Sequence, residues 1–60
     1  MSIEPTGEPR FVKASGDRAD PVGSIGADWG FWDETWSHWY GGYDDEGGAR
    51  DACREYADRL

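Results

Sequence analysis

Two groups of neighbouring acids, Asp33 with Glu34 and Asp44 to Glu46, are the first candidates for chemistry in this sequence. Acid–base catalysis needs two carboxyls that face each other across a cleft, in environments that separate their pKa values. Neighbouring acids in a turn or at a helix start do not give that arrangement, and helix capping explains the second group. A calcium loop needs alternating acids that end in a bidentate Glu, which YDDEGG lacks. We therefore expect neither catalysis nor a metal site.

The other residues that could carry chemistry stand alone in the sequence. Ser37 precedes His38, the single histidine, but successive side chains on a strand point apart, so the two do not form a nucleophile–base pair. Cys53 would be the only other soft ligand for zinc, and we expect it to be a small buried apolar side chain. The glycine pairs 41–42 and 47–48 lack the lysine of a phosphate-binding loop. The sequence predicts a protein that is not an enzyme and uses no cofactor.

Length and composition set further limits. The chain has 60 residues, with thirteen acids against six bases and a net charge of −7. So short a chain makes one domain with a thin core. No apolar run approaches the ~20 residues that span a bilayer, and residues 1–10 contain no apolar signal region. A single cysteine fits a reducing compartment. We expect a monomeric cytoplasmic protein that does not contact membranes.

The charge is concentrated in the middle of the chain. Residues 1–18 and 50–60 each contain equal numbers of acids and bases, whereas no base lies between Arg18 and Arg50. The acids of this middle stretch are Asp20, Asp28, Asp33, Glu34, Asp44, Asp45 and Glu46. Seven of the nine aromatic residues lie there as well: Trp29, Phe31, Trp32, Trp36, Trp39, Tyr40 and Tyr43. The whole net charge and most of the aromatic surface therefore belong to one segment.

Three segments precede the aromatic one, and one follows it. Residues 1–9 are rich in Pro, Gly and Glu and predict a flexible N-terminal arm, which leaves residues 10–60 as the single domain. Arg10–Ala14 contains β-formers and predicts a strand, and Ser15–Gly26 predicts a loop because of its glycines and proline. At the C-terminus, apolar residues recur with helical spacing at Ala49, Ala52, Cys53, Tyr56 and Leu60. Asp44 or Asp45 offers the N-cap, and Gly47 and Gly48 suggest that this helix starts late.

The aromatic segment fits two structures. As a helix it would place most of its tryptophans and tyrosines on one face. As a hairpin it would contain strands Asp28–Trp32 and Thr35–Tyr40, a turn at Asp33 and Glu34, and a break at the glycines 41–42 before the helix. The hairpin would set Trp32, Trp36 and Tyr40 on one face and Phe31, Thr35, Ser37 and Trp39 on the other. We favour the hairpin. It predicts an α+β fold in which a C-terminal helix packs on an antiparallel sheet of about three strands; the alternative is a mostly α fold with an aromatic central helix.

The charge also indicates the kind of partner. Aromatic rings could stack on bases, but phosphates must be neutralised by lysine and arginine, so direct nucleic-acid binding is disfavoured. Carboxylates instead suit a basic protein surface that normally holds nucleic acid. Trp and Tyr are enriched at binding hot spots, although a tiny domain also needs them in its core. The predicted contact residues are Asp28, Asp33, Glu34, Trp36, Trp39, Asp44, Asp45 and Glu46.

In its size, acidity and charge distribution, the chain resembles the phage-encoded anti-CRISPR proteins, several of which mimic DNA. The resemblance implies a stoichiometric inhibitor that occupies the DNA- or PAM-contacting surface of a Cas complex subunit in the host cytoplasm. A different class of function is a small adaptor or accessory subunit that docks on a larger protein through its aromatic face. A globular fragment without a basic partner is the third possibility.

Overall fold

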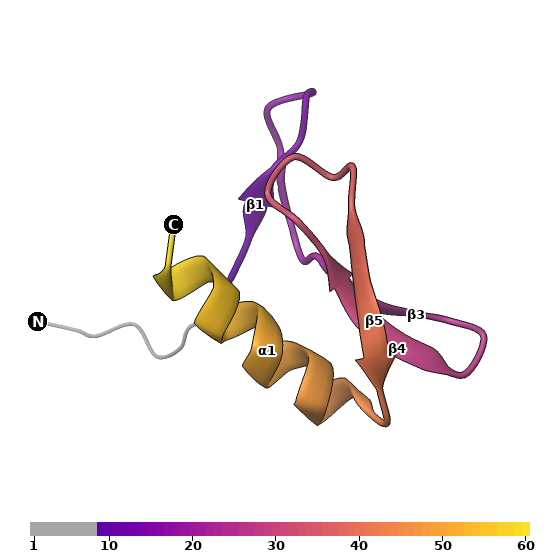
Figure 1. The fold of residues 1–60 in the computed structure, drawn as a ribbon. Helices are drawn as coiled ribbons and strands as arrows, with labels where there is room; N and C mark the ends of the chain where they lie inside the picture. Colours follow the sequence, from indigo (N-terminus) through magenta and orange to yellow (C-terminus); the bar gives the residue numbers. More distant parts are fainter. Residues whose placement is uncertain (1–8) are drawn as a thin grey trace, which may run out of the picture.

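The computed structural model describes residues 9–60, which form five strands and one helix (Figure 1). The elements are β1 (Phe11–Val12), β2 (Arg18–Ala19), β3 (Val22–Ile25), β4 (Asp28–Trp32), β5 (Trp39–Tyr43) and α1 (Glu46–Asp58). The predicted arm over residues 1–9 lies outside the described residues, except for Pro9. The predicted α+β class, with a small antiparallel sheet and a C-terminal helix, is confirmed.

The strands form two antiparallel sheets. β1 pairs with β2, and a three-stranded sheet has the order β3-β4-β5. The predicted loop over Ser15–Gly26 was wrong, because it contains β2 and β3. The β-branched residues Val22 and Ile25 pair with β4, and Gly26, at φ 63°, permits the two-residue turn between these strands. The predicted strand Arg10–Ala14 is confirmed only at its centre.

The aromatic segment forms the predicted hairpin and not a central helix. β4 has its predicted bounds, but β5 begins at Trp39 instead of Thr35, because residues 33–38 form a longer loop. In this loop one carboxylate oxygen of Asp33 accepts hydrogen bonds from the backbone N–H groups of Thr35 and Ser37, at 3.1 and 3.0 Å. These backbone groups are therefore not available to a strand ladder.

The longer loop changes which aromatic side chains share a face of the sheet. Phe31 lies opposite Tyr40, and Trp32 lies opposite Trp39. The predicted grouping of Trp32 with Tyr40, and of Phe31 with Trp39, was therefore wrong. Trp36 belongs to neither strand, since it lies in the loop between them.

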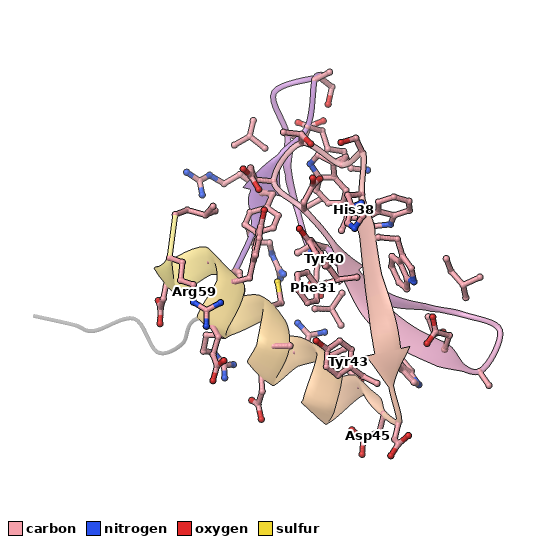
Figure 2. All side chains as sticks on the ribbon, in the orientation of Figure 1. Phe31, His38, Tyr40, Tyr43, Asp45 and Arg59 are labelled. Carbon is pink, nitrogen blue, oxygen red and sulfur yellow. The ribbon has the colours of Figure 1, made fainter. Side chains whose placement is uncertain are left out.

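The core lies between α1 and the sheet. Phe11, Phe31 and Cys53 are its buried residues, and half-buried aromatic side chains surround them (Figure 2). The ring of Phe31 lies 6.4 Å from that of Tyr43 and 5.7 Å from that of Tyr56, measured between centroids. These contacts join β4, β5 and α1 into one cluster.

The helix presents the predicted apolar stripe to this core. Ala49 and Cys53 are fully buried and Ala52 and Tyr56 are half-buried, whereas Leu60 follows the helix and is 66% exposed. Burial raises the pKa of the Cys53 thiol to about 11, helped by the negative charge of Asp20. The thiol therefore stays protonated at neutral pH, as suits the predicted structural role.

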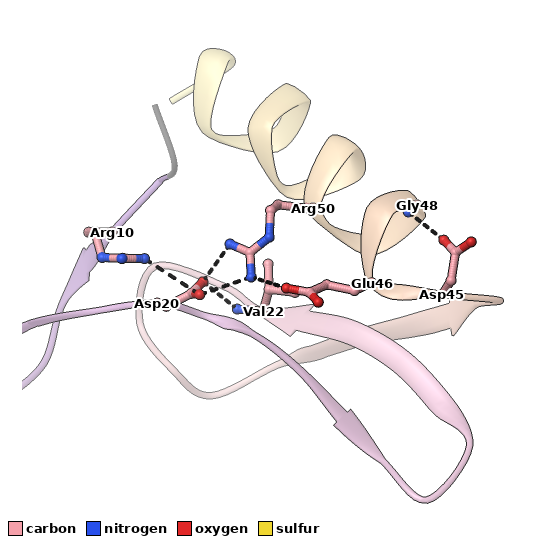
Figure 3. Close-up of polar contacts among 7 residues, drawn as sticks. All are labelled: Arg10, Asp20, Val22, Asp45, Glu46, Gly48 and Arg50. Carbon is pink, nitrogen blue, oxygen red and sulfur yellow. Dashed lines mark hydrogen bonds and ion pairs between the residues drawn. The ribbon is translucent and has the colours of Figure 1, made fainter. Parts of the chain in front are cut away.

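The helix starts at Glu46, so the predicted late start was wrong. Asp45 is the N-cap, and its carboxylate accepts a hydrogen bond of 2.9 Å from the backbone N–H of Gly48 (Figure 3). Arg50 lies one turn further on, where it pairs with Glu46 at 2.6 Å. The cap and this ion pair stabilise a first turn that two glycines would otherwise weaken.

A cluster of ion pairs joins the helix to the N-terminal part of the domain. The Asp20 carboxylate lies 3.1 Å from Arg50 and 3.5 Å from Arg10, as Figure 3 shows. Asp20 precedes β3 and also accepts the backbone N–H of Val22 at 3.1 Å. One carboxylate therefore links β3, α1 and the segment before β1.

Removal of the helix cap is expected to destabilise the protein. Asp45→Ala should lower the free energy of unfolding by about 1 kcal/mol, because the N–H of Gly48 loses its acceptor. Chemical unfolding followed by circular dichroism measures this change. Asp44→Ala is the matched control, since Asp44 is exposed and its side chain has no partner within residues 9–60. Equal losses in both variants would contradict the assignment of Asp45 as the cap.

Candidate functional site

One face of the three-stranded sheet is left open. The helix covers the face that carries Phe31, and no described helix or strand covers the opposite one (Figure 1). Side chains alternate along a strand, so the neighbours of Phe31 and Tyr40 point to the uncovered side. The register places these residues on it: Gly23, Ile25, Asp28, Gly30, Trp32, Trp39 and Gly41. We call this set the open face.

Trp39 lies across the glycines of the open face. A Cβ atom at Gly30 would be 2.9 Å from Cζ2 of Trp39, and one at Gly41 would be 2.6 Å from its Nε1. The indole therefore packs directly on the backbone of Gly30 and Gly41, where the Cβ atom of any other residue would clash with it. Trp32 meets it edge to face, with the two ring centroids 5.3 Å apart and an angle of 62° between the ring planes. The two tryptophans form a half-buried aromatic surface on the sheet.

A β-bulge shapes this surface. Between the pairs Trp29–Tyr43 and Phe31–Tyr40, the single residue Gly30 opposes both Gly41 and Gly42. Gly42 has φ 97°, which side chains rarely allow, and its N–H bonds to the Asp28 carboxylate at 2.6 Å. The prediction that the glycines 41–42 separate a strand from the helix was wrong, since both belong to β5.

Asp28 is fixed at the edge of the Trp39 ring. One carboxylate oxygen accepts the Gly42 N–H, and the other accepts the indole N–H of Trp39 at 3.3 Å. Ile25 lies opposite Asp28 in the register and is 58% exposed. The structure thus brings together two predicted contact residues, Asp28 and Trp39. Each oxygen of Asp28 accepts one of these hydrogen bonds and keeps capacity for another.

Asp33, Glu34 and Trp36 lie in the loop at the other end of β4. Asp33 organises the loop, as described above, and Glu34 accepts a hydrogen bond from the Tyr56 hydroxyl of the helix. This bond, together with burial, raises the pKa of Tyr56. Trp36 packs edge to face on Phe11, with ring centroids 6.5 Å apart. All three predicted contact residues therefore have partners within the molecule.

Trp36 is held in an unusual conformation. Its φ of 61° lies in the left-handed region, and its indole N–H is buried with no hydrogen-bond partner in the part of the chain that the structure describes. The ammonium of Lys13 lies 5.0 Å from the ring centroid. Contacts with Phe11 and Lys13 stabilise the indole in this position.

The acids before and at the start of α1 have different surroundings. Asp45 caps the helix, Glu46 pairs with Arg50, and Asp44 is exposed. The eight predicted contact residues therefore do not form one cluster: Asp33, Glu34 and Trp36 lie in the loop after β4, a five-residue strand about 16 Å long, whereas Asp28 begins that strand. Trp32 and the two glycines beneath Trp39 were not among the predicted contact residues. The cross-strand register, which no local pattern fixed, decides their positions.

Ser37 and His38 do not form a catalytic pair. The Ser37 hydroxyl bonds to that of Thr35 at 2.7 Å, and the His38 ring packs against Tyr40 at 4.6 Å between centroids. Within residues 9–60 we find no pocket and no group of three potential metal ligands. None of the helices in that range is long and apolar enough to cross a membrane.

Comparison of the sequence with protein-family models and with curated proteins, and of the fold with solved structures, gives no match.

The glycine under Trp39 is expected to be essential for stability. At Gly30 a Cβ would lie 2.2 Å from the backbone oxygen of Tyr40, so Gly30→Ala should cost about 2 kcal/mol or more of unfolding free energy. Gly23→Ala is the control on the same face, because a Cβ there meets nothing within 4 Å. Thermal or chemical unfolding of both variants tests this. Similar stabilities of the two variants would contradict the described packing.

The Asp33 loop should make stability depend on acid pH. Burial opposes ionisation of Asp33, but hydrogen bonds from Ser37, Thr35 and His38 outweigh it and hold the pKa of its carboxyl below the ordinary value of 3.8. The ionised form is therefore favoured by folding, so its stabilisation is complete above that value and is lost as the pH falls through the lower, folded-state pKa. Asp33→Asn should be less stable than the native protein at neutral pH, and the difference should shrink in strong acid. A constant difference across unfolding curves from neutral to acid pH would contradict this.

Proposed function

We propose that this protein is a non-enzymatic binding protein that docks through its open face on a basic surface of a larger protein. The observation that carries the proposal is the open face itself, where Trp32 and Trp39 lie beside the fixed carboxylate of Asp28. No base lies between Arg18 and Arg50, so none of the residues of β3, β4 and β5 can satisfy these acids with a positive charge of its own. A partner with lysines and arginines would supply it.

The aromatic pair would provide affinity and the acids would provide selectivity. Large aromatic residues bury much area and recur at binding hot spots. A net charge of −7 attracts basic surfaces from a distance and repels nucleic acid and other acidic proteins. Asp28 and the two tryptophans lie on the same side of the sheet, which supports a binding role over a purely structural use of the tryptophans.

A narrower form of the proposal is an inhibitor that mimics DNA in the host cytoplasm. Acids lie at both ends of β4: Asp33 and Glu34 at one end, and Asp28 with Asp44 at the other. Carboxylates separated in this way can pair with more than one arginine or lysine of a DNA-binding groove, such as the PAM-contacting surface of a CRISPR–Cas effector. In this form the protein acts as a monomer and blocks the site of nucleic-acid binding.

The first experiment identifies and maps the partner. The immobilised protein is incubated with the heparin-binding fraction of a host lysate, and retained proteins are identified and purified. Ile25→Arg places a base on the open face and should weaken binding of the purified partner about tenfold or more. Leu60→Arg is the matched control, because it makes the same change of charge at a similarly exposed aliphatic residue outside the open face. Equal affinities of the two variants would contradict docking through this face.

The second experiment separates the mimic from the adaptor. The purified partner is bound to its own nucleic acid and titrated with the protein. Displacement of the nucleic acid, with affinity that falls steeply as salt rises, is expected of a DNA mimic. Simultaneous binding of both, with little dependence on salt, would identify an adaptor and contradict mimicry.

A further inference from the structure

The outer side of the Trp39 ring is the most specific feature of the open face. Its inner side rests on Gly30 and Gly41, and its indole nitrogen donates to Asp28. Trp32 meets the ring only edge to face. One broad side of the indole is therefore left without a covering element in the described part of the chain, and a carboxylate is fixed at the edge of the ring.

This combination attracts a cation. The face of an indole carries negative potential, and a cation within about 6 Å of the ring centroid is attracted to it. The indole N–H lies in the plane of the ring, so its hydrogen bond holds the Asp28 carboxylate near that plane. A cation stacked on the outer side of the ring is thus close to a negative charge as well. Asp28 cannot rotate away without losing its bonds to Trp39 and Gly42.

The shape of the site favours arginine over lysine. A guanidinium is planar and stacks on an aromatic face, and its N–H groups can reach sideways to a carboxylate while it stacks. A lysine ammonium is compact and more strongly hydrated, so it gains less from a flat surface. Ile25, which lies opposite Asp28 and is 58% exposed, offers an apolar neighbour for the methylene groups of a long side chain.

We propose that Trp39 and Asp28 form a recognition site for a single arginine side chain of the protein partner, stacked on the indole and paired with the carboxylate. The inference rests on the proposed function, since it names the group by which a basic partner is bound. The site selects arginine-bearing segments over lysine-bearing ones of equal charge. Trp32 borders the stacked guanidinium.

Short blocked peptides test the proposal without knowledge of the partner. Acetyl-Gly-Arg-Gly-amide, its lysine analogue and its uncharged citrulline analogue are titrated separately into the labelled protein at low salt. Two-dimensional NMR resolves the indole N–H signals of the four tryptophans and reports which of them shift. We expect the arginine peptide to shift the signals of Trp39 and Trp32 in a saturable way, and to leave that of Trp36 unchanged.

Affinities and variants give the quantitative prediction. The lysine peptide should bind about threefold more weakly than the arginine peptide, and the citrulline peptide about tenfold more weakly. Asp28→Asn should weaken arginine binding roughly two- to fivefold. Asp44→Asn removes the same charge near the same end of the sheet without touching Trp39, and should change the affinity by much less. The circular dichroism spectra of both variants must match that of the native protein.

If Asp28→Asn alters the fold, the three peptides on the native protein still decide the question. Equal binding of arginine and lysine peptides at Trp39 would overturn arginine selectivity but leave docking on a basic surface intact. Equal binding of the citrulline peptide would overturn both, because charge would then not matter. Arginine-dependent shifts confined to Trp36 or Trp29 would overturn this site and leave a basic partner possible elsewhere on the molecule.

Discussion

The packing of Phe31 against α1 is the interaction on which the rest of the structure depends. Phe31 lies in the central strand of the sheet, and its ring meets Tyr40, Tyr43 and Tyr56 from β5 and the helix. With Phe11 and Cys53 it accounts for most of the buried apolar residues. A domain of this size has one core of this kind, and the side of the sheet that faces it is fixed by Phe31.

That constraint explains why tryptophans occupy the other side. A single 13-residue helix covers one face of three strands, and the described chain has no second helix for the opposite face. Trp32 and Trp39 partly bury themselves instead, by contact with each other and with glycine backbone. Their residual exposure, and the absence of bases from the same segment, are the two facts from which binding to a basic partner is inferred.

The parts of the fold that local signals specify could be predicted from the sequence, and those that long-range contacts specify could not. The apolar spacing of α1 and the bounds of β4 are local properties; β4 has its predicted bounds, and of the predicted apolar stripe only Leu60 lies outside the helix. The 33–38 loop depends on several hydrogen bonds to the carboxylate of Asp33, and no short sequence motif predicts this arrangement. One extended loop shifted the register and exchanged the faces of Tyr40 and Trp39. For the same reason the candidate site was found only in part: Asp28 and Trp39 were named from charge and residue type, but their contact depends on a bulge.

The carboxylate of Asp20 has a consequence for the behaviour of the protein at high concentration. A small open sheet normally offers its outer strands as templates for other chains, which leads to polymers. Here Asp20 accepts a hydrogen bond from the N–H of Val22 on the outer strand β3, so this donor is not available to another chain. The edge formed by β3 is thus partly blocked by a side chain of the same molecule, and the like charges of two copies oppose their approach. The carboxylate that joins β3 to α1 therefore also limits the use of this edge by a second copy of the chain.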